Sequence, residues 1–286
     1  MISLRVLRRR IRSIQNTAKI TKAMEMVATA KMRRAQEQAI RGRPYAEKIS
    51  EVIADLAVEP QTGQGSPLLE KRPVQRICII HFTSDRGLCG GLNANMNRMV
   101  GNFLVEQKAE VSLVTVGRKG RDYMRRFDRK IVAEFTGLGD KPRMVEALPI
   151  ARVVLDDYRE RKVDQVLLAY SKFVSTVVQK PVVEPLLPVV PAELPKGMTH
   201  DYIYEPHGAF VLERLLPRFV EMQVYHALLE AIASEQSARM VAMRNATDAA
   251  RDIIAELTNM LNKVRQEIIT KELLEITSGA EAQAKH

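Results

Sequence analysis

A long apolar stripe near the C-terminus, with apolar residues alternately three and four positions apart, constrains the fold more than any other feature of the sequence. Fourteen of its seventeen positions are apolar, whereas the overall hydrophobic content of 46% would give about eight. A mean spacing of 3.5 residues over this length predicts a long helix in a left-handed coiled coil. The positions are Leu212, Leu215, Phe219, Met222, His226, Leu229, Ala233, Gln236, Met240, Met243, Thr247, Ala250, Ile254, Leu257, Leu261, Val264 and Ile268.

The first part of the chain offers a partner for this helix. Apolar residues keep helical spacing from Leu4 onward and resume it beyond Pro44, a potential kink site, so we expect one helix over about 3–57. The last helix is expected over about 209–277. Because a globular region separates the two in sequence, a paired coiled coil must be antiparallel. The polar seam positions His226, Gln236 and Thr247 are interpreted as setting its register.

The C-terminal helix is expected to outlast its mate. It spans roughly 100 Å against about 80 Å for the first, which leaves about 20 Å unpaired. That end remains apolar, and a bare apolar helix is unstable in water, so we expect another protein to surround it. Its apolar residues are Leu257, Leu261, Val264, Ile268, Ile269, Leu273 and Leu274.

The region between the helices has the pattern of an α/β domain. Short aliphatic runs alternate with amphipathic stretches, which predicts a mainly parallel, Rossmann-like sheet with right-handed crossovers. We therefore divide the chain into a coiled-coil helix at 1–58, a central α/β domain at 73–206 and a coiled-coil helix at 209–278. The expected strands are Arg76–Thr83, Val111–Val116, Val166–Tyr170 and, at the edges, Val177–Glu184 and Tyr202–Tyr204; the expected helices are 92–107, 118–127 and 143–162.

Charge is concentrated at one end of the chain. The net charge is +10, and residues 1–44 carry twelve basic against two acidic side chains, so the remainder is neutral overall. Such a segment favours an acidic partner. A basic-zipper DNA reader is disfavoured, because the basic residues interleave with the apolar stripe and the long heptad stretch lies two hundred residues away.

A glycine-rich loop, SDRGLCGGLN at 84–93, follows one strand and precedes a helix, where phosphate-binding loops occur. It lacks the spacing of a dinucleotide fingerprint or a P-loop, so a tight turn with close packing is the favoured interpretation. Cys89 is interpreted as a small buried residue. No histidine spacing indicates a metal site, and no side-chain set indicates catalysis. The sequence therefore predicts no cofactor and no metal. No apolar run is long enough to span a membrane.

Three long segments resemble the gamma subunit family of F-type ATP synthases, in its bacterial form. They are IRSIQNTAKITKAMEMVATAKMRRA at 11–35, the loop at 84–93, and IASEQSARMVAMRNATDAARDIIAEL at 232–257; the likeness extends in order over essentially the whole chain.

This resemblance implies a non-catalytic rotor shaft. The terminal helices would enter a hexamer of alpha and beta subunits, and the α/β domain would rest with epsilon on the ring of c subunits. The shaft would couple ion flow to ATP synthesis or hydrolysis, at the cytoplasmic face of a bacterial membrane and peripheral to it.

The resemblance also assigns residues. Met24, with Lys19 and Lys22, would face the acidic lever segment of beta, and Arg265 and Gln266 would contact a beta loop. The base near the c-ring and epsilon would include Tyr202, Tyr204 and Glu205, and the family loop would include Asp85, Arg86, Gly87, Cys89, Gly90 and Gly91. Two alternatives stay open at this point: a static coiled-coil scaffold or adaptor, and a nucleotide-dependent enzyme that uses the glycine-rich loop.

Overall fold

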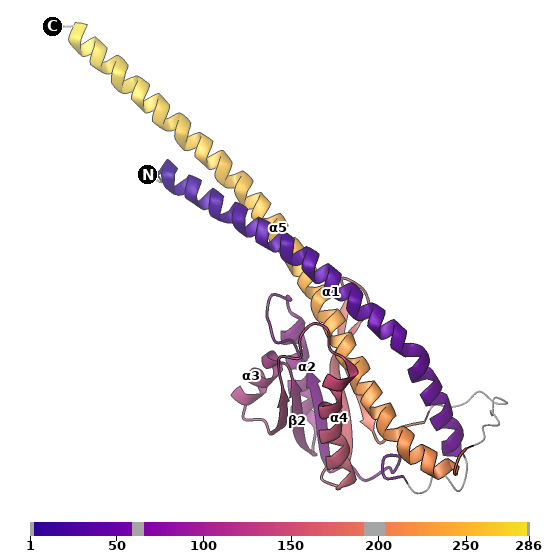
Figure 1. Cartoon of the computed structure of the whole chain (residues 1–286). Helices are drawn as coiled ribbons and strands as arrows, with labels where there is room; N and C mark the ends of the chain where they lie inside the picture. The colour runs from indigo at the N-terminus through magenta and orange to yellow at the C-terminus, as the bar shows by residue number, and fades with distance from the viewer. Residues whose placement is uncertain (1–2, 59–65, 192–203, 285–286) are drawn as a thin grey trace. The chain divides into compact units, whose positions relative to one another are not determined.

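The structure is a computed structural model that describes residues 3–58, 66–191 and 204–284. Two long helices, α1 (Leu4–Val58) and α5 (Gly208–Ala284), open and close the described chain, as expected (Figure 1). Pro44 lies inside α1. Helix α5 has 77 residues and therefore measures about 115 Å.

Contacts within the chain define two compact units, which are described separately. The first, called the helical-pair unit, comprises Met1–Val27 and Met240–His286, and the second, called the sheet unit, comprises Ala28–Arg239. Each of the two long helices therefore contributes residues to both units.

The sheet unit contains a five-stranded sheet with the order β3-β2-β1-β4-β5. Strands β1 to β4 run parallel, and β5 pairs antiparallel with β4 at the edge. The parallel, Rossmann-like arrangement agrees with the sequence-based expectation. The strands are β1 (Arg76–Phe82), β2 (Glu110–Val116), β3 (Ile131–Phe135), β4 (Gln165–Phe173) and β5 (Gln179–Leu187), and the helices between them are α2 (Leu92–Glu106), α3 (Arg118–Arg126) and α4 (Met144–Arg159).

Two strands differ from the expectation. Strand β3 was not expected, because its five residues alternate between half-buried and exposed side chains and lack the continuous apolar run used to find the others. Strand β5 begins at Gln179 rather than Val177, because the Ser175 side-chain oxygen accepts hydrogen bonds from the backbone of Val177 and Val178 and holds them in a turn. Of the expected strand at Tyr202–Tyr204, the first two residues lie outside the described residues, and Tyr204 is not in a strand.

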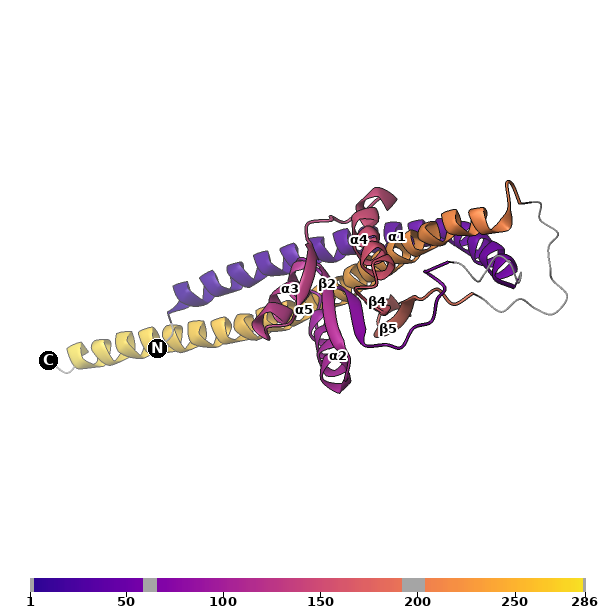
Figure 2. The same ribbon diagram turned by 90° about the horizontal axis from the view of Figure 1, so that it is seen from below.

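Helices cover both faces of the sheet, and Figure 2 shows α2 and α4 on opposite sides of the strands. Helices α2 and α3 bury Met96, Val100 and Met124 against one face. Helix α4 covers the other face together with the sheet-unit parts of α1 and α5, and α5 contributes a fully buried row there, Leu212, Leu216, Val220 and Val224. The apolar stripe of α5 in this unit is thus ordinary protein core.

In the helical-pair unit the start of α1 lies beside α5, and the two run antiparallel (Figure 1). Thr21 pairs with Thr247 and Glu25 with Arg244, so residue numbers rise along one helix as they fall along the other. The buried apolar residues of this pair are Leu7, Met240, Met243 and Ala250. The last turns of α5 carry exposed apolar side chains, Ile269, Leu273, Leu274 and Ile276. Despite their length, neither long helix has an apolar stretch that could cross a bilayer, and the same holds for the other described helices.

Candidate functional site

A buried pair of threonines fixes the register of the helical-pair unit. The Oγ1 atoms of Thr21 and Thr247 lie 2.7 Å apart, and Thr247 also donates to the backbone oxygen of Met243. A buried hydroxyl without a partner costs more than the bond itself contributes, so slippage of one helix against the other is disfavoured. The register role predicted for Thr247 is therefore supported by its geometry.

A buried acid lies one turn away on α1. Glu25 is 6% exposed and accepts hydrogen bonds from Lys22 Nζ at 2.9 Å and from Arg244 Nε at 3.1 Å. The hydrogen bond from Lys22 lowers the pKa of Glu25 below its ordinary value, Arg244 adds to this effect, and burial opposes it. Glu25 therefore holds a negative charge inside the pair that both helices share.

The predicted partner contacts on α1 are exposed to different degrees. Lys19 is exposed, and Lys22 is exposed while it binds Glu25. Met24 is half-buried and belongs to a strip with Ile20 and Val27, which are 60% and 53% exposed and lie four and three residues from it. The sequence analysis did not predict this strip. Its residues each precede a buried position of α1 by one residue, and this helical spacing could have identified them.

The residues near the end of α5 that are predicted to contact a partner are exposed. Arg265 and Gln266 are both exposed, and neither makes a polar contact within the described part of the protein. They lie just before the exposed apolar side chains of the last turns. This stretch offers a guanidinium, an amide and apolar surface together, which suits a partner more than it suits water.

In the glycine-rich loop, the Asp85 carboxylate lies at the N-terminus of α3. It accepts a hydrogen bond from the backbone N–H of Arg118, the first residue of α3, at 3.0 Å, and another from the N–H of Gly137 at 2.8 Å. Helix N-termini attract anions because their first N–H groups lack partners within the helix. Here the chain supplies its own anion to the N-terminus of α3.

The rest of the loop is held by side chains rather than by close backbone packing. Asn93 donates to Ser84 Oγ at 2.7 Å and to Cys89 Sγ at 3.2 Å, and Cys89 is 2% exposed, as expected for a small buried residue. Burial raises the pKa of its thiol. Gly90 has a φ of +58°, which a turn requires, whereas a Cβ on Gly87 would touch nothing within 4 Å. The expectation of close packing was therefore wrong for Gly87. Arg86 and Gly91 are exposed.

The close backbone approach occurs at Gly117 instead, between β2 and α3. Its φ is +100°, and a Cβ there would overlap the backbone oxygen of Thr83. This glycine lets the loop after β1 lie directly against the start of α3. At the other predicted site, the base, Tyr204 packs against the core and Glu205 is exposed, while Tyr202 lies outside the described residues.

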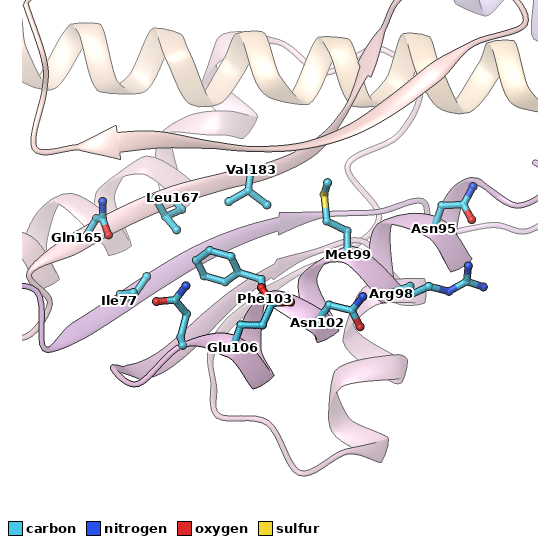
Figure 3. A pocket seen from close by; sticks show the side chains of 11 residues that line it. Ile77, Asn95, Arg98, Met99, Asn102, Phe103, Glu106, Gln165, Leu167 and Val183 are labelled. Carbon is cyan, nitrogen blue, oxygen red and sulfur yellow. The ribbon is translucent and has the colours of Figure 1, made fainter.

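A groove of 780 Å³ runs along α2 beside strands β1, β4 and β5 (Figure 3). Its floor is apolar, with Ile77, Leu167 and Val183 facing Phe103, and Arg98 and Glu106 lie at its rim. Ile77 and Gln165 belong to the amino ends of their strands, away from the carboxyl edge where this class of fold binds nucleotides. The residues that line the groove include no nucleophilic side chain next to a general acid or base.

Elsewhere in the described part of the chain, buried polar groups do not assemble into a metal site. Within the described ranges no three His, Cys, Asp or Glu side chains are grouped so that they could hold a metal ion. His81 is fully buried between β1 and α3, and burial lowers its pKa to about 4. Neither of its ring nitrogens has a hydrogen-bond partner among the described residues, and the same is true of Thr115 Oγ1 and Asn97 Oδ1.

Comparison with known proteins gives the chain relatives over its whole length. The family model described as ATP synthase matches residues 3–283. A protein of Dehalococcoides mccartyi named ATP synthase gamma chain is 61% identical over 285 residues, which cover 99% of this chain and all of the relative. Another of that name, from a Roseiflexus species, is 48% identical over the full length of both chains.

Solved structures show the same fold. A chain in the central stalk/c-ring structure of the Tetrahymena thermophila mitochondrial ATP synthase is 27% identical, with a TM-score of 0.61 and coverage of 79% of this chain and 99% of that chain. A chain of the Euglena gracilis mitochondrial enzyme in rotational state 3 is 22% identical, with a TM-score of 0.67 over 98% and 94% of the two chains. With an antiparallel helical pair, a Rossmann-like sheet and relatives matched from end to end, the chain belongs to the ATP synthase gamma chain family.

Proposed function

We propose that this chain is the rotating, non-catalytic shaft of an ATP synthase, coupling ion flow to ATP synthesis or hydrolysis. The observation that carries the proposal is the helical-pair unit, in which an antiparallel pair ends in α5 turns with exposed Ile269, Leu273, Leu274 and Ile276. Exposed apolar residues in this number call for a surrounding partner. A hexamer of alpha and beta subunits would provide it.

The exposed residues can make two kinds of contact with a partner: apolar contacts that allow sliding, and hydrogen bonds that fix a position. The strip of Ile20, Met24 and Val27 can slide along a partner because it makes no directional bond. The basic side chains of the first helix, Lys19 and Lys22 among them, attract an acidic segment of beta. Arg265 and Gln266 can make fixed hydrogen bonds, so they would define angular positions of the shaft.

The remaining assignments follow from the same proposal. Nucleotide chemistry would belong to the neighbouring subunits. The base around Tyr202, Tyr204 and Glu205 would contact epsilon and the ring of c subunits, since the Tetrahymena structure combines a central stalk with a c-ring. The chain would then be peripheral to the cytoplasmic face of a bacterial membrane, with one copy in each complex.

The test is a reconstituted membrane complex that carries Arg265→Ala with Gln266→Ala. We expect the ratio of ion pumping to ATP hydrolysis to fall about tenfold, since a charge-assisted contact and a neutral one are both lost. Lys263→Ala is the matched control, because it removes one positive charge from an exposed position of the same helix. It should change this ratio by less than about twofold.

A direct readout separates a shaft from a static scaffold. A probe attached to this chain in a surface-held complex should turn when ATP is added. A complex that hydrolyses ATP and pumps ions while the probe stays still would overturn the proposal. ATP hydrolysis by the purified chain alone would instead restore the enzyme alternative.

A further inference from the structure

In the sheet unit, one stretch of α5 is held by polar contacts on two roughly opposite sides. We call residues 230–239 the clamp segment. Its bonding side chains are Glu230, Ser234, Gln236, Ser237 and Arg239, and each contacts a different backbone or loop position of the unit. At 100° per residue, these side chains point to different sides of the helix.

The first side faces strand β4 and the turn that follows it. Glu230 Oε2 accepts the backbone N–H of Phe173 at 2.8 Å, and Ser234 Oγ donates to the backbone oxygen of Ser171 at 2.7 Å. Ser237 Oγ donates to the backbone oxygen of Thr176 at 2.8 Å. Glu230, Ser234 and Ser237 stand four and three residues apart, so they form one row along the helix.

The second side faces the loop after β3. Gln236, which is 1% exposed, donates from Nε2 to Asp140 Oδ1 at 3.2 Å. The other oxygen of the same carboxylate lies 2.6 Å from Lys31 Nζ. Asp140 thereby joins α1 and α5, the two long helices, to one loop of the α/β fold. Gln236 was expected to set the register of a coiled-coil seam, and the structure gives it this contact instead.

The second side also faces the glycine-rich loop, because Arg239 lies three residues after Gln236. Arg239 donates to the backbone oxygen of Gly87 at 3.1 Å and to Glu235 Oε1 at 2.7 Å. Arg239 is 9% exposed, so this guanidinium is largely withdrawn from water and its contacts are strongly directional. The family loop is thus attached to α5 through a backbone atom.

Apolar packing alone would not lock a helix against rotation about its axis. The hydrophobic effect has no direction, so a helix held only by apolar contacts can roll while it stays buried. Hydrogen bonds weaken steeply with misalignment, and buried groups that lose partners are penalised. Bonds on two opposite sides therefore oppose both rolling and sliding of the clamp segment.

We propose that the clamp segment is the joint through which torque passes between the α/β fold and the shaft helix. Glu230, Ser234 and Ser237 are positioning residues in this joint, and Asp140 extends it to α1. The inference rests on the proposed function, since a static protein would carry no torque. Its test must therefore report on the stiffness of the rotor and not only on activity.

The experiment uses the complex with a probe on this chain. Val105→Cys, on α2, provides the attachment point, because Val105 is 74% exposed whereas Cys78 and Cys89 are buried. The test variant combines Glu230→Ala, Ser234→Ala and Ser237→Ala in that background. With the shaft stalled in the hexamer, the variance of the probe angle should rise about twofold or more, because three directional bonds are gone. ATP-driven pumping against an opposing gradient should fall while hydrolysis continues.

Two controls separate a loss of torque transfer from a loss of fold. Glu230→Gln keeps an oxygen acceptor for Phe173 and should retain the stiffness of the parent. Glu213→Ala, at an exposed position of the same helix, should do the same. Should the triple variant fail to assemble, Ser234→Ala and Ser237→Ala are measured singly.

The outcomes are distinct. A variant complex that assembles with unchanged angular variance and unchanged pumping overturns the joint while leaving the shaft function intact. A parent complex whose probe never turns overturns the proposed function itself. Greater variance in Glu230→Gln, as large as that in the triple variant, would show that the carboxylate charge, and not the hydrogen bond to Phe173, holds the helix, which also contradicts the inference.

Discussion

Helix α5 is stabilised in two different ways along its length. In the sheet unit its apolar row, Leu212, Leu216, Val220 and Val224, is at most 1% exposed. In the helical-pair unit its last turns carry Leu273 and Ile276 at 58% and 68% exposure. The spacing of apolar residues is helical in both stretches. The pattern therefore shows that a helix has an apolar side, but it does not show whether the same chain covers that side.

The largest expected effect on stability comes from a substitution in the buried apolar row of α5. Leu216→Ala removes a fully buried side chain and should lower the free energy of unfolding by about 2–5 kcal/mol through lost burial and the cavity left behind. All seven tyrosines lie between residues 28 and 239, so tyrosine fluorescence during urea unfolding reports on the sheet unit alone. A loss below about 0.5 kcal/mol would show that this part of α5 is not core.

The next effect is a pH dependence of the sheet unit. Burial lowers the pKa of His81 from 6.5 to about 4, so the unfolded chain binds more protons between these values. Stability should therefore fall as pH falls from 6.5 towards 4, by up to about 3 kcal/mol in total, since one pKa unit corresponds to 1.36 kcal/mol. Gly120 lies against the ring, and the pKa of His81 is shifted by burial alone.

His81→Leu should flatten this pH dependence in urea titrations followed by tyrosine fluorescence. His207→Gln, at an exposed position of the same unit, is the control and should leave the slope unchanged. An equal slope in the His81→Leu variant and the parent would assign the acid sensitivity to other groups.

The smallest effect is at the end of α5. Leu273→Ala with Ile276→Ala should change the unfolding free energy of the isolated chain by less than about 0.5 kcal/mol, because both side chains are exposed and alanine favours helix. The same variant should bind less well to the purified hexamer of alpha and beta subunits, measured by co-elution. Normal co-elution together with a marked loss of stability would mean that this stretch folds against its own chain.

Much of the fold could be predicted from the sequence because its elements have strong periodic patterns. The long helices and strands β1, β2 and β4 have long or continuous apolar patterns, whereas the five residues of β3 alternate between half-buried and exposed side chains. Less of the candidate site than of the fold could be predicted from the sequence. Asp85 could be named from the family loop, but its bonds to Arg118 and Gly137 join residues 33 and 52 positions away. The clamp segment could not be predicted for the same reason. From the sequence, Gln236 looks like a polar residue of a coiled-coil seam and Ser237 like a residue on the helix surface. Only the folded structure brings Asp140 and Thr176 next to them.

Strand β5 has a consequence for the protein before assembly. It forms one border of the sheet, and two of its nine residues, Pro181 and Pro185, have no N–H to offer a neighbouring strand. A border with missing donors is a poor template for a foreign strand. Before assembly, copies of the newly synthesised chain are therefore less prone to aggregate by pairing the edge strands of their sheets.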